Sequence, residues 1–312
     1  MSIKTAECVS PKHPDKICDI IADSLLDAYL TIDKNSRTAI EVMGGHKLIT
    51  INGEVTSLGK PDLESIVRGI VGDDYTVQIN IVAQSPEIAR GVDIGGAGDQ
   101  GIMKGYATAE TKSMMPLEYE LARNLCQEIY KVYPFDGKTQ VTLIDGKVSA
   151  VVASFQHAPT EALTTLVKSI INSEYYFINP AGEWNQGGFD ADTGLSGRKL
   201  IVDNYGPEIP IGGGSFSGKD YTKVDRSGAY MARKIAVDFI HSGAQEVFVK
   251  LAYAIGIPEP VMAVAIVDGK EIPITNYNLT PRGIRELLKL DEVTYADTAT
   301  WGHFGRGCRW DK

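Results

Sequence analysis

TQVTLIDGKVSAVVASF, residues 139–155, decides how this chain is expected to fold. Apolar and polar residues alternate on both sides of Asp145-Gly146, and this dipeptide favours the tight turn of a β-hairpin. The stretch therefore predicts two antiparallel strands, residues 139–144 and 147–155.

Outward from this hairpin, helical and strand patterns follow one another in clusters. Apolar residues recur at helical spacing over residues 16–30, 62–71, 118–132, 160–171, 224–242 and 280–288. Strand patterns occupy residues 38–42, 47–51, 76–82, 199–202, 246–254 and 261–267. Because strict alternation is missing, the order favours an α+β fold with mixed or antiparallel sheets over a doubly wound sheet. Three clusters each hold strands with a helix or two, which indicates three similar units.

Glycine-rich stretches at residues 91–101 and 186–218 separate the clusters. They divide the chain into an N-terminal segment (1–93), a middle segment (94–187) and a C-terminal segment (188–312). Each segment is expected to be α+β, and the spatial domains need not follow these boundaries.

The composition excludes several classes of protein. The chain has 312 residues with 31 basic and 40 acidic side chains, a net charge of −9, which argues against a nucleic-acid binder. No run of 18 apolar residues occurs and the first residues hold no apolar stretch, so we expect neither a membrane span nor a signal peptide. The four cysteines are scattered and are expected to be reduced thiols of a cytoplasmic protein.

ECVSPKHPDK, residues 7–16, is the first candidate for chemistry. It crowds His13, Asp15 and Lys16 at the start of a predicted helix, where backbone N–H groups and the helix dipole favour an anion. This arrangement suits a phosphate together with a metal ion. The alternative is that Asp15 only caps the helix.

GGGSFSGKD, residues 212–220, is the second candidate. From Gly213 it reads G-x-x-x-x-G-K, but Asp220 stands where a P-loop has the Ser or Thr that meets Mg²⁺. A phosphate-contacting glycine loop of another kind is therefore favoured over a true P-loop, and a plain flexible loop stays possible. Residues 198–234 carry seven basic and four acidic side chains, an island that fits a nucleoside triphosphate. Asp225 among these lysines is a candidate Mg²⁺ ligand.

GAGDQG, residues 96–101, matches a dinucleotide-binding pattern only formally, because no strand is predicted before it and no helix after it. An active-site turn that presents Asp99 is the better interpretation. The chain has no G-x-S-x-G stretch and no cysteine in an electropositive setting, so a covalent protein intermediate is not expected.

These stretches together resemble the S-adenosylmethionine synthetase (methionine adenosyltransferase) family. The resemblance keeps the family's order over residues 7–16, 52–56, 84–92, 96–111, 138–142, 177–182, 193–203, 212–226, 253–256 and 302–306. It implies three similar α+β units around a pseudo-threefold axis, with sheets that carry helices on one face. It also implies that ATP and L-methionine react to give S-adenosylmethionine, and that the triphosphate is then hydrolysed to phosphate and diphosphate.

The resemblance implies roles for individual residues. The reacting centre would hold His13, Lys138, Asp99 and Lys223. ATP and its phosphates would contact Lys16, Asp136, Lys138, Trp184, Arg198, Lys199, Ser215 and Lys219. Methionine would contact Glu54, Gln84, Asp192 and Lys223. Two Mg²⁺ ions per site would be held by Asp15 and Asp225, K⁺ by Glu41, with Glu7 near the metal and phosphates. Subunits would self-associate as a dimer or tetramer and complete each active site together, without nucleic acid or membrane as partners.

Several segments depart from the family pattern, among them a short C-terminal part and Pro11-Lys12 where Glu-Gly is usual. Asp93-Ile94-Gly95 is shorter than the family's mobile gate, and Glu183-Trp184 stands where Arg-Phe is usual. Two other interpretations remain at this point: a P-loop-like kinase or ATPase, and a relative that binds nucleotide without catalysis.

Overall fold

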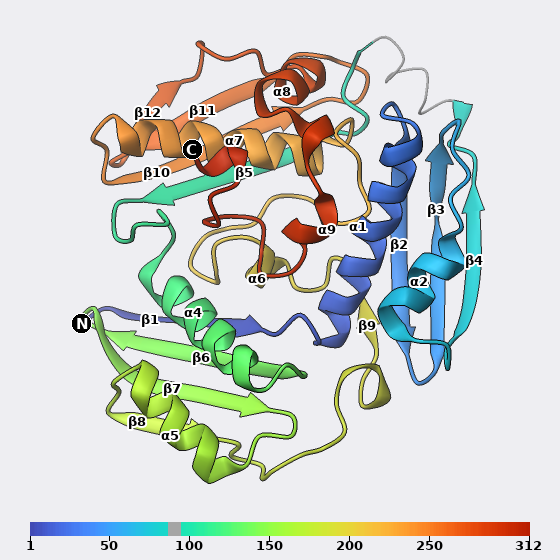
Figure 1. Ribbon diagram of the computed structural model, residues 1–312. Helices are drawn as coiled ribbons and strands as arrows, with labels where there is room; N and C mark the ends of the chain where they lie inside the picture. Colours follow the sequence, from blue (N-terminus) through green and yellow to red (C-terminus); the bar gives the residue numbers. More distant parts are fainter. Residues whose placement is uncertain (87–94) are drawn as a thin grey trace.

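The structure is a computed structural model that describes residues 1–86 and 95–312, and its three four-stranded sheets surround a common centre (Figure 1). The helices are α1 (Pro14–Ile32), α2 (Leu63–Val71), α4 (Leu117–Val132), α5 (Thr160–Ile170), α6 (Leu200–Asp203), α7 (Val224–His241), α8 (Pro281–Leu288) and α9 (Tyr295–Thr298). Short 3₁₀ turns lie at Gly188–Asp190, Leu290–Glu292 and Arg309–Asp311.

Each sheet is built on a central antiparallel hairpin. The first sheet has the order β4-β3-β2-β9, with β2 (Arg37–Gly45), β3 (Leu48–Thr56), β4 (Thr76–Val82) and β9 (Gly194–Leu195). The second has the order β1-β6-β7-β8, with β1 (Ile3–Val9), β6 (Gly137–Ile144), β7 (Lys147–Phe155) and β8 (Tyr175–Ile178). The third has the order β12-β11-β10-β5, with β5 (Gly101–Thr108), β10 (Glu246–Tyr253), β11 (Met262–Val267) and β12 (Lys270–Pro273).

The three units exchange strands in a cycle. β1 precedes α1 in the chain but pairs with β6 of the second sheet, and β5 precedes α4 but pairs with β10 of the third. β9, which precedes α7, closes the cycle by pairing with β2 of the first sheet. The expectation of three similar α+β units around a pseudo-threefold axis is therefore confirmed, and no sheet is confined to one segment of the chain.

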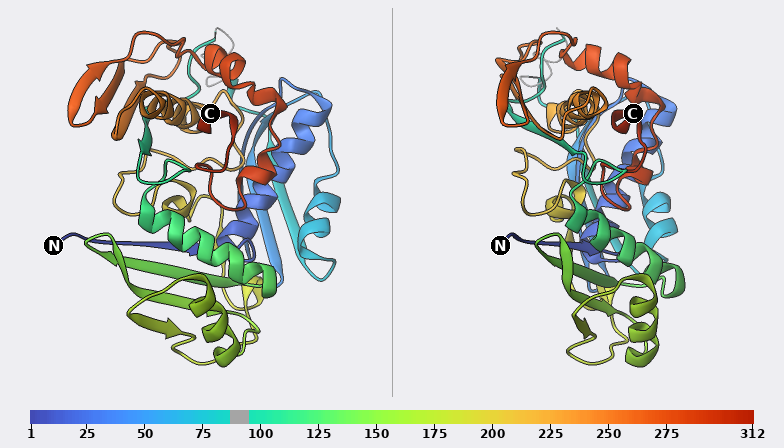
Figure 2. Two further views of the ribbon diagram at one scale, coloured as in Figure 1. Left: turned by 60° about the vertical axis from the view of Figure 1, so that its left-hand side comes forward. Right: turned by 90° about the vertical axis from the view of Figure 1, so that its left-hand side faces the viewer.

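One long helix covers each sheet. α1 packs on β2, α4 on β1 and β6, and α7 on β5 and β10. Figure 2 shows these helices on one side of the sheets, so that the opposite faces are left without a helix. Those faces expose the apolar side chains of Met43, Ile102 and Phe177.

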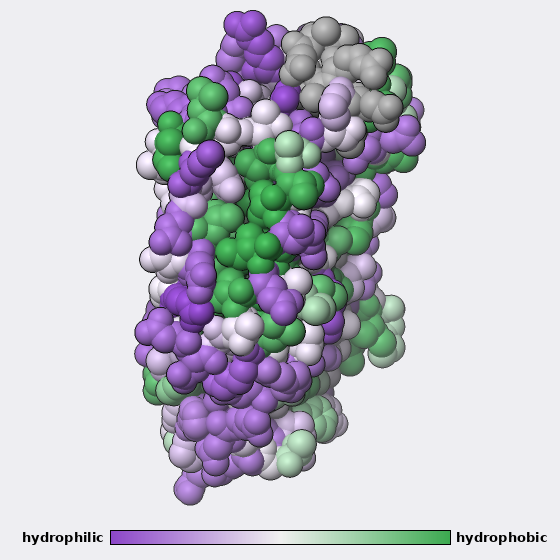
Figure 3. All heavy atoms as spheres, turned by 90° about the vertical axis from the view of Figure 1, so that its right-hand side faces the viewer, coloured by the Kyte–Doolittle hydropathy of each residue, from purple (hydrophilic) through white to green (hydrophobic). Residues whose placement is uncertain are grey.

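The apolar interior has two parts. The larger cluster lies under the second and third sheets, and the smaller one joins α1 and α2 to the first sheet. On the side of the molecule that carries α2 and β4, apolar side chains also gather at the surface (Figure 3). Ile66, Ile70, Val77 and Ile81 are half-buried there against the smaller cluster.

The prediction of a strand over residues 199–202 is wrong, because the chain forms the helical turn α6 there. The N–H groups of Val202 and Asp203 both donate to the Lys199 carbonyl at 2.9 Å. These backbone hydrogen bonds form within the segment, as in a helical turn, and not to a neighbouring strand. β5 was not predicted, because Gly101 and Gly105 weaken its strand pattern. Gly105 is nevertheless required, since a Cβ there would lie 2.1 Å from the Ala232 carbonyl carbon of α7.

No helix in the described ranges is both long and apolar enough to cross a membrane. Of the shortened gate segment, Asp93 and Ile94 lie outside the described residues.

Candidate functional site

A cavity of about 370 Å³ opens beside the N-terminus of α1, on the helix-free face of the second sheet. The β1–β6–β7 register places Glu7, Lys138 and Ser154 on this face. Six residues expected at the site line the cavity, namely Glu7, His13, Asp136, Lys138, Trp184 and Asp192. The fold thus collects residues that are up to 185 positions apart in the chain.

His13 caps α1 and lies at the wall of the cavity. Its Nδ1 accepts a hydrogen bond of 3.2 Å from the Asp15 backbone N–H, so the proton of the neutral ring resides on Nε2. Burial lowers the pKa of His13 to about 4, and the positive charges of Lys199 and Lys138 add to this effect. The side chain is therefore a neutral hydrogen-bond donor at neutral pH.

This lowered pKa predicts a pH dependence of stability. The folded pKa of about 4 lies below the ordinary value of 6.5, so folding favours the neutral ring. The resulting stability is complete above pH ~6.5 and is lost as the pH falls towards ~4, up to about 3 kcal/mol. Urea unfolding in chelator between pH 4.5 and 7 should therefore show a shallower pH slope for His13→Asn than for the wild type. Equal slopes would contradict the assignment.

Asp15 joins a cationic loop to the cavity. One oxygen of its buried carboxylate accepts the Leu195 N–H at 3.0 Å, and the other lies 2.7 Å from Lys199 Nζ. Arg198 Nε lies 3.4 Å from Asp15 Oδ1. Burial opposes the charge of Asp15, but the hydrogen bonds from Lys199 and Leu195 outweigh it and lower its pKa. Two cations therefore stand next to His13 around one carboxylate.

The glycine-rich loop carries a second pairing of lysine and aspartate. Lys219 Nζ lies 2.8 Å from Asp225 Oδ2, and Lys223 Nζ lies 2.7 Å from Asp220 Oδ1. Gly214 packs directly on Asp225, because a Cβ there would lie 2.3 Å from the carboxylate. The loop enters α7 from the irregular residues 204–211 rather than from a strand, so it is not a P-loop.

Lys16 does not reach the cavity. It is fully buried, and its Nζ lies 3.0 Å from Asp19 Oδ2 and 2.5 Å from Asp203 Oδ1. Burial opposes its charge, but these carboxylates outweigh it and raise the pKa of Lys16. This position is at odds with the expected contact between Lys16 and phosphate, because the ammonium group is already saturated by the core.

Several other expected residues lie outside the cavity. Glu54 is exposed on β3, and Asp99 is exposed in the turn before β5. Gln84 follows β4, and its Oε1 is buried without a hydrogen-bond partner among the described residues. Glu41 on β2 accepts a hydrogen bond from the Ser196 hydroxyl, and burial raises its pKa. The cavity therefore holds Asp192 but none of the other residues expected to bind methionine.

Sequence reasoning missed the other acidic residues of α1. Asp19, Asp23 and Asp27 follow Asp15 at intervals of four residues, which places all of them on one face of the helix. The spacing was a visible signal, but their partners are backbone N–H groups of distant segments.

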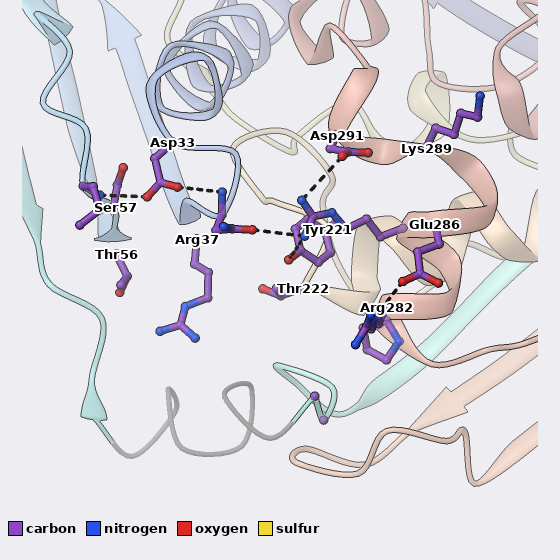
Figure 4. A pocket seen from close by; sticks show the side chains of 16 residues that line it. Asp33, Arg37, Thr56, Ser57, Tyr221, Thr222, Arg282, Glu286, Lys289 and Asp291 are labelled. Carbon is purple, nitrogen blue, oxygen red and sulfur yellow. Dashed lines mark hydrogen bonds and ion pairs between the residues drawn. The ribbon is translucent and has the colours of Figure 1, made fainter.

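A larger cavity of about 850 Å³ lies between α8 and the turn from α1 to β2 (Figure 4). It contains none of the residues expected at the site. Its charges largely pair with one another, since Arg282 Nε lies 2.9 Å from Glu286 and Arg285 lies 3.7 Å from Asp291. We therefore place the chemistry at the smaller cavity.

The donor set can be tested for a metal ion. No cluster of three or more His, Cys, Asp or Glu side chains able to hold a metal forms among the residues that the structure describes. Asp15 and Asp225 are single carboxylates beside lysines. Mg²⁺ is commonly held by one or two carboxylates together with substrate phosphates. These residues therefore fit an ion shared with a polyphosphate better than an ion in a protein cage.

Fold and site together define a class of protein. It is an α+β protein in which a neutral imidazole, an aromatic ring and Lys138 line one cavity, and the cations Arg198 and Lys199 stand next to that imidazole around Asp15, which suits a compact polyanion. The comparisons with known proteins are specific. The N-terminal, central and C-terminal domain models of S-adenosylmethionine synthetase match residues 1–92, 94–184 and 186–312.

The chain belongs to the S-adenosylmethionine synthetase family. It is 43% identical to an S-adenosylmethionine synthase of Mycoplasmopsis pulmonis, over 97% of this chain and 93% of the relative. It is 40% identical to the synthase of Brachyspira hyodysenteriae, with the same coverage. A solved structure of an unusual S-adenosylmethionine synthetase from Campylobacter jejuni superposes with a TM-score of 0.90 at 34% identity, covering all of this chain and 97% of that one.

Proposed function

We propose that this chain is a methionine adenosyltransferase that converts ATP, L-methionine and water into S-adenosylmethionine, phosphate and diphosphate. Family membership supports the transferase activity and both substrates. The observation that carries the assignment is the cavity in which neutral His13 stands beside Lys138 and Trp184.

The reaction requires that the two substrates be positioned and that the negative charge of the leaving triphosphate be stabilised. It does not require a general base. The methionine sulfur has a lone pair and no proton to lose, so it attacks C5′ of the ribose directly. The new S–C5′ bond forms as the C5′–O5′ bond breaks, and the electron pair leaves with the triphosphate. His13 Nε2–H donates to the departing O5′, and the cations of the site stabilise the growing negative charge.

Each residue expected at the site, other than Lys16, has a proposed contact, whether or not it lines the cavity. Trp184 stacks on the adenine ring and Asp136 faces the adenosine. The phosphates are met by Lys138, Arg198, Lys199, Ser215 and Lys219. Methionine is held by Glu54, Gln84, Asp192 and Lys223, and Asp99 lies beside the reacting atoms.

Asp15 and Asp225 would hold two Mg²⁺ ions, with Glu7 near them, and Glu41 would hold K⁺. When bound, the divalent ions neutralise phosphate oxygens. Ion pairs of 2.7 and 2.8 Å with Asp15 and Asp225 hold Lys199 and Lys219 in place, so the protein itself keeps these two cations where the phosphates would lie. The same cations would hold the tripolyphosphate while water cleaves it to phosphate and diphosphate.

We also propose that two chains associate through their helix-free sheet faces and complete each site together. None of Lys219, Lys223 and Asp225 lines the cavity. The exposed apolar side chains of Met43, Ile102 and Phe177 on the free faces suit burial against a second copy.

Shared sites predict complementation between inactive variants. Lys138→Ala and Lys219→Ala should each be inactive alone. If each site takes Lys138 from one chain and Lys219 from the other, co-expressed chains should form mixed dimers with one intact site and recover about a quarter of wild-type activity. Sites built within a single chain would show no recovery. The assay is S-adenosylmethionine formation by the co-purified mixture.

The function is tested by incubating the purified chain with ATP, L-methionine and Mg²⁺. We expect one phosphate to be released for each S-adenosylmethionine formed, and loss of both products in excess chelator. Phosphate release without S-adenosylmethionine would instead indicate an ATPase. Full activity in chelator would contradict the roles of Asp15 and Asp225.

A further inference from the structure

α1 carries an aspartate at every fourth position, and we name Asp15, Asp19, Asp23 and Asp27 the aspartate ladder. Residues four apart lie on the same face of a helix, each about 6 Å further along its axis. The first three are completely buried and Asp27 is half-buried. The ladder therefore runs through the interior of the molecule, where ionised side chains need partners.

Every member of the ladder accepts a backbone N–H from a distant segment. Asp15 binds the N–H of Leu195 at 3.0 Å, and Asp19 binds that of Gly197 at 2.8 Å. Asp23 binds the N–H of Gly218 at 2.9 Å. Asp27 binds the N–H groups of Tyr295 and Ala296 at 2.8 and 2.9 Å. One helix thus fixes three separate stretches of chain at set intervals.

Asp19 and Asp23 hold the two loops that carry cations proposed to bind phosphate. Gly197 is followed directly by Arg198 and Lys199, and Gly218 by Lys219. An N–H held by a buried carboxylate fixes the backbone one residue before Arg198 and Lys219 and two residues before Lys199. The positions of these cations along the polyphosphate are therefore set from α1.

The two glycines leave these loops little freedom to move. Gly197 has φ +69°, and a Cβ there would lie 2.3 Å from Ser215 Cβ. Gly218 has φ +81°, and a Cβ there would lie 2.0 Å from the Ile40 carbonyl oxygen. Both are conformations that glycine adopts most readily, in close contact with neighbouring chain.

Asp19 and Asp23 are neutralised by cations of the core, whereas Asp15 pairs with Arg198 and Lys199 of the site. Lys16 lies between Asp19 and Asp203, and the Arg226 guanidinium binds both oxygens of Asp23 at 2.6 and 2.8 Å. Arg198, Lys199 and Lys219 thus do not have to neutralise Asp19 or Asp23. This gives Lys16 a structural role in place of the expected contact with phosphate.

We propose that Asp19 and Asp23 are positioning residues, which set the two cationic loops relative to each other through the N–H groups of Gly197 and Gly218. The proposal rests on the proposed function, because it concerns the same polyphosphate. It adds residues that touch neither the substrate nor the reacting atoms.

Asp19 offers the sharper test, because Lys16 keeps Asp203 as a partner when Asp19 is removed. The matched control is Asp27, an aspartate of the same ladder that binds N–H groups of α9, which carries no proposed phosphate contact. Calorimetric titration of the full chain with inorganic tripolyphosphate and Mg²⁺ gives Kd and stoichiometry. We expect Asp19→Ala to raise Kd ~10-fold or more, and Asp27→Ala to change it less than ~2-fold.

The outcomes separate positioning from a general structural role. Partial unfolding would lower the stoichiometry and leave the Kd of the folded fraction unchanged. Asp19→Asn keeps an oxygen for the Gly197 N–H and should bind with an intermediate Kd. Equal Kd changes in the Asp19 and Asp27 variants, or none in either, would overturn the proposal. If the alanine variants do not fold, Asp19→Asn and Asp27→Asn provide the same comparison. Failure of the wild type to bind tripolyphosphate would refute the proposed function instead.

Discussion

Replacement of His13 by asparagine is expected to slow adenosyl transfer by about 10²- to 10⁴-fold, the range for loss of one preorganised donor or acid. The Nε2–H of His13 is directed by the Asp15 N–H bond to Nδ1, and an asparagine amide cannot reproduce that geometry. Hydrolysis of added tripolyphosphate should fall much less, because that step has no departing O5′ for His13 to stabilise. A single-turnover quench experiment that follows S-adenosylmethionine and phosphate measures both steps.

The chain offers a matched control for this substitution. His241 lies at the exposed end of α7, away from the cavity, and His241→Asn should leave both steps unchanged. If His13→Asn slowed transfer and hydrolysis by the same factor, His13 would have to act on a feature common to both, such as the placement of the phosphates.

Local signals predicted the long helices and the strands of the three central hairpins, because the causes of these elements lie within a few residues. The Asp145-Gly146 turn is confirmed between β6 and β7, with φ +47° and +77° at the two turn residues. The exchange of β1, β5 and β9 between sheets could not be predicted in this way. β1 pairs with a strand more than 120 residues away, and no short pattern in residues 3–9 encodes that partner.

The site was predictable where residue types alone carry the chemistry. His13 and Asp15 were recognised from their residue types and Lys138 from the family resemblance, and the fold brings the three to one place. Lys16 was assigned to phosphate from its place with His13 and Asp15 at the start of a predicted helix and from the family resemblance. Its burial depends on Asp203, which is 187 residues further along and reaches α1 only after the chain has folded. Side chains whose partners are distant were therefore the ones that sequence reasoning misplaced.

Replacement of Asp23 by alanine is expected to lower the free energy of unfolding by about 3–5 kcal/mol, since removal of one partner leaves a buried charge unpaired. Arg226 is 1% exposed and binds both Asp23 oxygens, so its guanidinium has no route to water. The Gly218 N–H loses its acceptor in the same variant. Urea unfolding at pH 7 measures the loss, and a change below about 1 kcal/mol would contradict this account.

A double variant separates two effects of losing Asp23. One is the loss of stability from the unpaired Arg226 charge, and the other is the loss of the hydrogen bond that positions Gly218. Asp23→Leu combined with Arg226→Met replaces the buried pair by apolar groups of similar volume, which commonly restores much of the stability. The Gly218 N–H still has no carboxylate to hold it, so Lys219 remains displaced from the polyphosphate. We therefore expect the double variant to be clearly more stable than Asp23→Ala and yet to bind tripolyphosphate as weakly. Recovery of both properties together would mean that the ion pair, and not the hydrogen bond to Gly218, places the loop.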